Sequence, residues 1–260
     1  MAAIRCYLQR VIFECEVSWR GVTRGITNYL SLLREIECTR KNDEPVALAT
    51  FNYDTLLDQA VESFGQKIER MADYVERPTL FRLFKLHGSV NWARVVENGI
   101  PANINREHPP SVLHFLIGQA ANLSISDRFV LCTPSSMGMA NKLPVFPAIA
   151  VPIEAKRTFE CPKEMVNQID QVIPDVSKLL IIGWRATEEH FLEKLRQGLR
   201  PDVHVYIVAG GPNASGEHPG EIIRTHLIRS LRYQPVDAQI DPSGFTDFLS
   251  SGRAKEFLES

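Results

Sequence analysis

The chain has 260 residues, of which 44% are hydrophobic and 23% are charged, as in ordinary globular proteins. This length is enough to bury a hydrophobic core without help from a metal or a disulfide. The formal net charge of −2 provides no overall positive field for a nucleic-acid backbone. We therefore expect no nucleic-acid partner.

The five cysteines include no C-x-x-C pair that could form half of a zinc ribbon. Charged residues interrupt the N-terminal apolar residues, and no segment approaches the roughly 20 apolar residues of a membrane span. These features predict a cytoplasmic protein that is neither exported nor embedded in a membrane, with reduced cysteines.

Residues 1–22 fit two patterns, because the alternation around Val11 and Phe13 suits a strand, whereas the spacing of Ile4, Leu8 and Val11 suits a helix. From Thr23 to about residue 38, apolar residues recur every three or four positions, which predicts an amphipathic helix. A polar loop follows this helix.

Short apolar runs then predict buried strands, and helical patterns follow the first, third and fourth of them. A last helix is expected over residues 243–258. Alternating strands and helices are typical of an α/β protein whose parallel sheet is covered on both faces. The predicted strands are 46–51, 83–86, 179–182 and 203–208, and the helices between them are 54–64, 187–199 and 220–232.

Residues 92–174 contain many prolines and no sustained periodicity, so we expect a small inserted region of irregular or helical structure there. The whole chain, 1–260, is then a single domain with a core built from about 23–91 and 175–260.

Ligands of open parallel sheets bind outside the carboxyl ends of the strands, where loops and helix N-termini converge. This rule selects the residues that follow each predicted strand as candidates for a functional site. They are Asn52, Tyr53 and Asp54 after the first strand, His87, Gly88 and Ser89 after the second, Gly183 and Trp184 after the third, and Gly210 and Gly211 after the fourth.

Each of these residues also has a purely structural interpretation. Asn52 could hold a water or a sugar hydroxyl, or it could be a turn residue. Asp54 suits the N-cap of the following helix better than a catalytic acid. His87 could act as a base near neutral pH, although a lone histidine is more often structural. Gly88 permits a tight turn or the close approach of a backbone to a ligand.

Three segments together resemble the successive motifs of the sirtuin family. They read TFNYDTLL at residues 50–57, KLHGS at residues 85–89 and LIIGW at residues 180–184. The resemblance is closest to zinc-free bacterial sirtuin-like domains that act as NAD hydrolases in antiphage defence, and it covers roughly residues 45–210.

This resemblance implies a Rossmann-like fold with NAD as substrate and no metal. Asn52 would orient the nicotinamide ribose or a water, and His87 would accept a proton during cleavage of the nicotinamide–ribose bond. The residues that would line the nucleotide are Thr50, Phe51, Tyr53, Asp54, Gly88, Ser89, Gly183 and Trp184.

Two family features have no counterpart in this sequence. A strand with a glycine-rich phosphate loop is expected before Thr23 and is not found, and the four-cysteine zinc module of deacylating sirtuins is also missing. The first absence supports an alternative, a non-catalytic or truncated module that binds an ADP-ribose-like nucleotide or a partner. The second lowers the expectation of a protein deacylase. A homo-oligomer or a partner defence protein fits both of the leading interpretations.

Overall fold

A computed structural model describes residues 2–23, 27–40, 44, 46–76, 80–151, 158–213, 216–231 and 237–260. Predictions that fall on the remaining positions, such as residues 24–26 of the helix expected from Thr23, lie outside the described residues. Thr23 itself is the last residue of the preceding helix. The chain divides into two compact units: unit 1 comprises 1–25, 45–155 and 159–166, and unit 2 comprises 26–44, 156–158 and 167–260. The predicted division into a core and an insertion remains a prediction.

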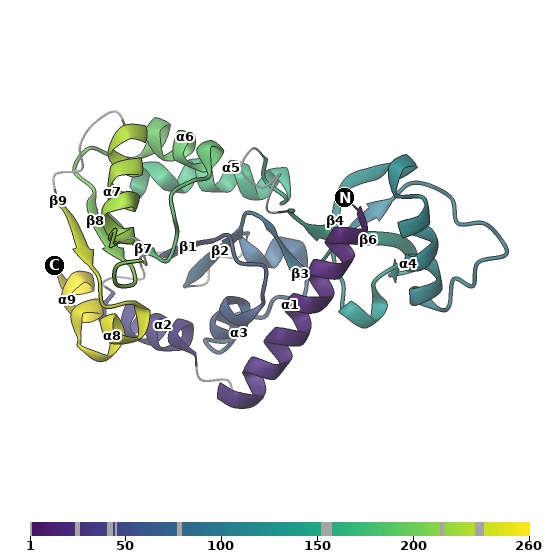
Figure 1. Ribbon diagram of the computed structural model, residues 1–260, viewed down its shortest axis with the longest axis horizontal. Helices are drawn as coiled ribbons and strands as arrows, with labels where there is room; N and C mark the ends of the chain where they lie inside the picture. The colour runs from purple at the N-terminus through teal and green to yellow at the C-terminus, as the bar shows by residue number, and fades with distance from the viewer. Residues whose placement is uncertain are drawn as a thin grey trace. The chain divides into compact units, whose positions relative to one another are not determined.

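Unit 1 contains a parallel strand pair and an antiparallel sheet (Figure 1). Strands β1 (Val46–Thr50) and β2 (Phe81–Lys85) pair in parallel, as expected for the first two predicted strands. Helix α3 (Leu56–Glu62) follows β1, and its buried residues Leu57, Ala60 and Val61 show the expected helical spacing. A single helical turn, η1 (Met71–Tyr74), precedes β2.

The antiparallel sheet has the order β4-β3-β6-β5 and lies in the region expected to be irregular or helical. Prolines at 144 and 147 obscured strand β6, and the register between β3 and β6 shifts between Gly88 and Ala93. The elements of this region are β3 (Gly88–Val96), α4 (Pro109–Gly118), η2 (Ala120–Asn122), β4 (Ile125–Leu131), η3 (Pro134–Ser136), β5 (Met139–Ala140) and β6 (Leu143–Ile149).

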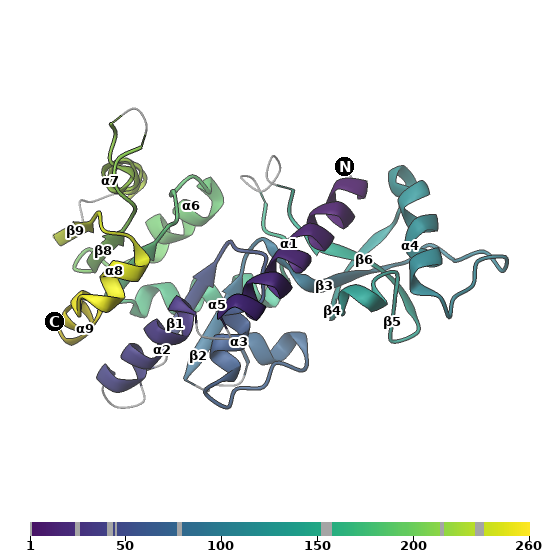
Figure 2. The same ribbon diagram turned by 60° about the horizontal axis from the view of Figure 1, so that its bottom comes forward.

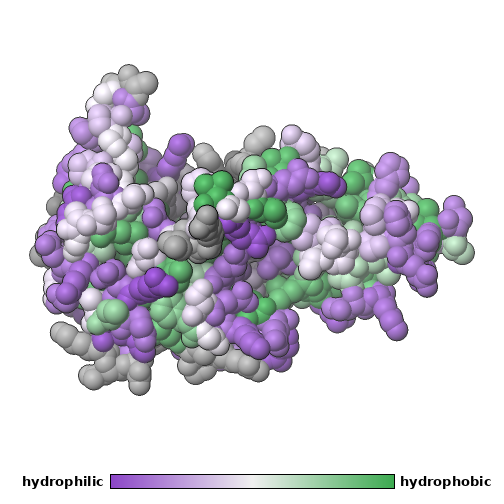
Figure 3. Space-filling model, turned by 90° about the horizontal axis from the view of Figure 1, so that it is seen from below, coloured by the Kyte–Doolittle hydropathy of each residue, from purple (hydrophilic) through white to green (hydrophobic). Residues whose placement is uncertain are grey.

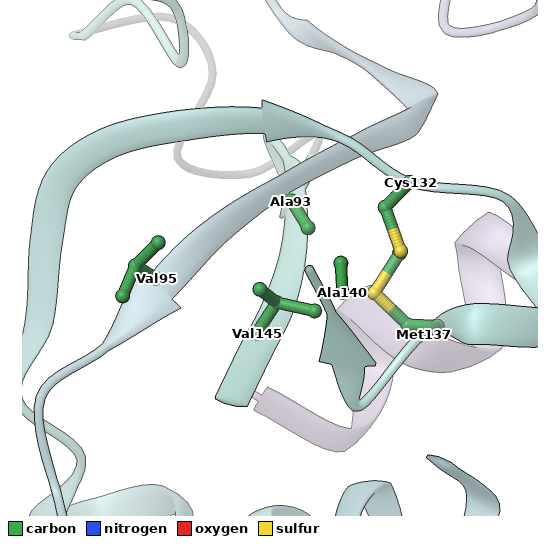
Figure 4. Packing of buried hydrophobic residues seen from close by; sticks show 6 residues of the cluster. All are labelled: Ala93, Val95, Cys132, Met137, Ala140 and Val145. Carbon is green, nitrogen blue, oxygen red and sulfur yellow. The ribbon is translucent and has the colours of Figure 1, made fainter. Parts of the chain in front are cut away.

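A small apolar cluster holds this sheet together. Figure 4 shows side chains from β3, β5 and β6 pointing toward one another, together with two sulfur-containing side chains from the connecting loops. All of them are buried, so they stabilise the sheet by removing apolar surface from water. The cluster consists of Ala93, Val95, Cys132, Met137, Ala140 and Val145.

Helix α1 (Ala2–Thr23) resolves the ambiguity of residues 1–22 in favour of a helix. It packs alongside β3 and β6 in both ribbon views (Figures 1 and 2). Two polar residues of the helix, Gln9 and Glu16, are buried against the rest of unit 1, at 4% and 3% exposure. The large apolar side chains that are most exposed within the described ranges lie mainly on this helix, and they are Ile4, Tyr7, Val17, Trp19 and Val22.

Figure 3 shows one face of the molecule, on which hydrophobic residues are interspersed with hydrophilic ones. Among the helices of the described residues, none is both long and apolar enough to cross a membrane.

Unit 2 contains a three-stranded parallel sheet, β7-β8-β9, with helices on both faces (Figure 1). One face packs Tyr206 and Val208 against Phe248 and Ala254 of the C-terminal helices. Helix α7 packs on β8 and β9, and α6 packs beside α7. The elements are α2 (Asn28–Thr39), α5 (Lys163–Val172, shared with unit 1), η4 (Ile173–Asp175), β7 (Lys178–Ile182), α6 (Glu189–Gly198), β8 (His204–Val208), α7 (Pro219–Ser230), β9 (Asp237–Asp241), α8 (Phe245–Ser250) and α9 (Arg253–Glu259).

The parallel pairing in both units confirms the predicted mixed α/β class. The single helix expected over residues 243–258 is wrong in detail, because it is divided into α8 and α9. Gly252 lies between them with a left-handed backbone, φ +81°, which ends one helix and allows the chain to turn into the next. Strand β9 was not predicted, since its residues alternate polar and apolar over a short span that gives a weak signal.

Candidate functional site

The two motif segments of unit 1 leave the sheet at the same edge. Thr50 and Lys85 are opposite each other at the ends of β1 and β2. The backbone N–H of Leu86 donates to the carbonyl of Thr50 at 3.0 Å, which continues the pairing by one residue. The segments that begin with Phe51 and His87 therefore start side by side, as the strand-end rule predicts.

His87 is packed against the aromatic residues on both sides of Asn52. The centre of its ring lies 4.8 Å from that of Phe51 and 6.2 Å from that of Tyr53, with the Tyr53 ring stacked at 26°. His87 is buried, with 4% of the residue exposed. Its backbone carbonyl accepts a hydrogen bond from the N–H of Ala150. Ring packing and backbone pairing thus fix the position of the imidazole.

Asn52 itself is exposed. Its backbone N–H donates to Thr50 Oγ1 at 3.1 Å, so the Thr50 hydroxyl shapes the turn that presents Asn52. The exposed amide of Asn52 can donate to and accept from a bound molecule. In the sequence it lies between Phe51 and Tyr53, whose rings contact the buried imidazole. The structure therefore brings Phe51, Asn52, Tyr53 and His87 into one small area.

Gly88 is required by the protein's own backbone. Its φ is +81°, and a Cβ atom at this position would lie 2.1 Å from the carbonyl oxygen of Ala148 in β6. The tight turn predicted for this glycine is observed, since Gly88 directly follows the turn at residues 86–87. The close approach of its backbone to a ligand stays a prediction.

Ser89 is fully buried, and its hydroxyl donates to the carbonyl of Tyr53 at 3.2 Å. The N–H of Val90 donates to the same carbonyl at 2.9 Å. The start of β3 thereby holds the loop that carries Asn52, and contact of Ser89 with a nucleotide stays a prediction.

Asp54 acts at the start of α3. Its Oδ1 accepts from the backbone N–H of Leu56, the first residue of α3, at 3.0 Å. The predicted N-cap role of Asp54 is wrong by one position, because the N-cap of α3 is Thr55, whose side chain makes no capping hydrogen bond. Asp54 precedes this cap, and its carboxylate accepts from the first N–H of the helix. Burial raises the pKa of Asp54, and the hydrogen bond from Leu56 and the charge of Lys85 oppose part of that rise.

A buried polar network lies behind this loop. Lys85 Nζ donates to Asp58 Oδ2 at 2.7 Å, and the Tyr74 hydroxyl donates to Asp58 Oδ1 at 2.6 Å. Trp92 Nε1 donates to the Tyr74 oxygen at 3.0 Å. Burial and the neighbouring Asp58 carboxylate raise the pKa of Tyr74 well above its usual value. Sequence reasoning did not find this network, because its members lie on four separate elements.

The remaining predicted site residues lie in unit 2. Gly183 follows β7, is exposed, and has a φ of +65° with no atom within 4 Å of a Cβ position. Trp184 Nε1 donates to Glu188 Oε2, and its ring meets the edge of Phe191 at 5.4 Å. Gly210 and the residue after it follow β8 and are exposed. These residues form the carboxyl edge of the unit 2 sheet.

Residues 46–99 match the SIR2-like domain. This segment spans β1, α3, β2 and β3, so it contains the candidate residues of unit 1 and the buried network beside them. The sirtuin-like resemblance is therefore confirmed for the motifs at residues 50–57 and 85–89, and it indicates an NAD-related function. The motif at residues 180–184 lies outside the matched segment, so its resemblance stays a prediction. A comparison with curated proteins gives no match. Within the described parts of the chain, no cluster of three or more histidine, cysteine, aspartate or glutamate side chains is arranged to hold a metal ion.

Proposed function

We propose that this protein is an NAD glycohydrolase that converts NAD and water to nicotinamide and ADP-ribose. The observation that carries the proposal is the packing of the His87 ring against Phe51 and Tyr53, the two neighbours of the exposed Asn52. This arrangement lies within the SIR2-like segment, and it combines a potential base with an exposed amide.

In this reaction the bond between the nicotinamide nitrogen and C1′ of the ribose breaks, and its electron pair neutralises the pyridinium. The ribose passes through an oxocarbenium-like state, and a water oxygen forms the new bond to C1′. The water loses one proton, so the products are neutral nicotinamide, ADP-ribose and a proton. The protein must orient the water, accept its proton and shield the cation from unwanted nucleophiles.

We assign these tasks to three kinds of side chain. The exposed amide of Asn52 orients the water or a ribose hydroxyl through its paired donor and acceptor groups. The imidazole of His87 accepts the proton as a general base. The rings of Phe51 and Tyr53, which already pack against His87, restrict the access of bulk water to the cation.

The other predicted nucleotide contacts are distributed between the units. In unit 1, Thr50, Asp54, Gly88 and Ser89 hold the loops in place by their own contacts. In unit 2, exposed Gly183 offers backbone without a side chain at the carboxyl edge of the sheet, where phosphates and sugars of nucleotides bind in open α/β folds. Contact of Gly183 and Trp184 with a nucleotide stays a prediction from the sequence.

The test is the release of nicotinamide from NAD by the purified full chain, without an acylated peptide. We expect release by the wild type and a loss of at least about 100-fold in Asn52→Ala and His87→Gln, in line with the removal of a general base or an orienting group. His114→Gln, at an exposed histidine of α4, is the control and should retain activity.

No release by the wild type would overturn the hydrolase assignment. If ADP-ribose still bound under those conditions, the non-catalytic nucleotide-binding module would replace it. Release that required an acylated peptide would instead identify a deacylase.

We further propose that this NAD hydrolysis serves the defence of bacteria against phage. Bacteria that express the chain should lose NAD after phage infection, whereas bacteria that express His87→Gln should not. Unchanged NAD in both strains would contradict the defence role and leave the chemical assignment to the test with purified protein.

A further inference from the structure

One peptide group in the candidate site is held at both ends by buried charged side chains. This is the peptide that joins Asp54 to Thr55. Its carbonyl oxygen accepts a hydrogen bond from Lys85 Nζ at 2.5 Å, and its N–H donates to Glu16 Oε2 at 2.8 Å. Lys85 belongs to β2 and Glu16 to α1, so two elements hold this peptide of the loop between β1 and α3.

Both charged groups are removed from water. Lys85 is 0% and Glu16 is 3% exposed. The second Glu16 oxygen accepts from the Thr55 hydroxyl at 2.5 Å and from Gln59 Nε2 at 3.0 Å, and Lys85 also binds Asp58. Burial of a charge is unfavourable unless several hydrogen bonds compensate it. These two charges therefore have well-defined positions, and the peptide between them has one defined orientation.

The location of this peptide connects it to the proposed chemistry. It lies two residues after Asn52, and Lys85 lies two residues before His87. The preceding carbonyl, that of Tyr53, is also held, by Ser89 and Val90. The backbone that leads from Asn52 into α3 is thus fixed from α1, β2 and β3.

We propose that Glu16 and Lys85 are positioning residues, which hold the Asp54–Thr55 peptide and thereby set the loop of Asn52 relative to His87. The inference rests on the proposed NAD hydrolysis for its effect on rate. Neither side chain needs to touch NAD, because each acts through the backbone of the loop. A displacement of a catalytic group by about 1 Å can reduce a rate about 100-fold, so the loss of one hydrogen-bond partner here should be visible in kcat.

The kinetic test compares variants of two buried polar residues on α1. Glu16→Leu removes the acceptor of the Thr55 N–H, and Glu16→Gln keeps an acceptor oxygen without the charge. Gln9→Leu is the control for the loss of a buried polar group from α1, because Gln9 is 4% exposed and donates to the Val90 carbonyl at 2.7 Å and not to the Asp54–Thr55 peptide.

We expect Glu16→Leu to lower kcat by about 10- to 100-fold with KM changed less than about threefold. Glu16→Gln should recover most of the loss, and Gln9→Leu should keep kcat within about threefold of the wild type. Lys85→Met, which removes the donor to the Asp54 carbonyl, should show the same separation of kcat from KM as Glu16→Leu. Equal losses of kcat in Glu16→Leu and Gln9→Leu would overturn the positioning role.

A second measurement does not require NAD turnover. Hydrogen exchange of the Thr55 amide should be at least about 10-fold faster in Glu16→Leu than in the wild type, because its acceptor is gone. Amides of β2 should exchange at unchanged rates. Unchanged protection of Thr55 would overturn the inference. If the wild type does not release nicotinamide but the Thr55 amide loses protection in Glu16→Leu, the proposed function fails. The role of Glu16 in positioning the loop is then still supported.

Discussion

Lys85 Nζ lies 2.7 Å from Asp58 Oδ2, and the two side chains are 0% and 5% exposed, so they form a buried ion pair between β2 and α3. The pair is extended by the Tyr74 hydroxyl, which donates to the other Asp58 oxygen, and by the Trp92 indole. Because α3 follows the Asn52 loop and β2 leads to His87, the ion pair links the two candidate catalytic segments through the interior of unit 1.

Removal of one member of this pair should destabilise the protein strongly. Asp58→Ala leaves the Lys85 charge buried without its carboxylate, and we expect a loss of about 3–5 kcal/mol in the free energy of unfolding. The double variant Lys85→Met with Asp58→Leu should recover much of this loss, since neither charge then remains buried. Denaturant unfolding of the three proteins measures both effects. A loss below about 1 kcal/mol in Asp58→Ala would contradict the role of the pair.

Gly88→Ala should be more destabilising than Gly183→Ala. Both glycines have positive φ values, +81° and +65°, but only at Gly88 would the new Cβ meet backbone, 2.1 Å from the Ala148 oxygen. The left-handed conformation alone costs about 1–2 kcal/mol for a residue with a side chain, and the clash at Gly88 adds to this cost. Thermal unfolding distinguishes the two variants, and equal shifts in Tm would contradict the account.

Asn52→Ala should separate activity from stability. Because Asn52 is exposed, we expect its free energy of unfolding to stay within about 0.5 kcal/mol of the wild type. NAD hydrolysis should nevertheless fall at least about 100-fold, as expected for the loss of a group that orients the reactants. A variant that loses stability and activity together would show that Asn52 supports the fold instead of the chemistry.

Asp54 should give the protein a measurable dependence of stability on pH. Burial raises its pKa in the folded state, so the folded protein binds this proton more tightly than the unfolded chain, in which the pKa is about 3.9. The corresponding stability is fully present below the unfolded pKa and is lost as the pH rises through the folded pKa.

Asp54→Asn retains an oxygen that can accept from Leu56 and does not ionise. The stability of the wild type relative to this variant should therefore decrease as the pH is raised from about 4 to neutrality. Denaturant unfolding over this pH range provides the measurement. A relative stability of the wild type that increases with pH would show that the interaction with Lys85 outweighs burial.

Strong local patterns predicted much of the secondary structure. Helix α6 buries Phe191, Leu192 and Leu195 at the spacing read from the sequence, and the apolar run at 203–208 forms β8. Predictions failed where the local signal was weak or contradictory. Prolines 144 and 147 obscured β6, and the short alternating segment 237–241 gave little indication of β9. Residues 1–22 fitted both the strand and the helix periodicity. They form a helix that buries Gln9 and Glu16.

The sequence by itself located the ends of the first two strands to within one residue, since it predicted ends at residues 51 and 86 and the strands end at Thr50 and Lys85. It thereby identified the loop of Asn52 and the segment of His87 as neighbours. This followed from the order of strands and helices and from motifs that are contiguous in the chain. Only the tertiary structure decided that the His87 ring packs against the two neighbours of Asn52, that Gly88 accommodates Ala148, and that Glu16 binds the backbone N–H of a residue 39 positions away. The physical reason is that periodicity reports local burial, whereas a buried charge must find its partners in space, on elements whose separation along the chain carries no local signal.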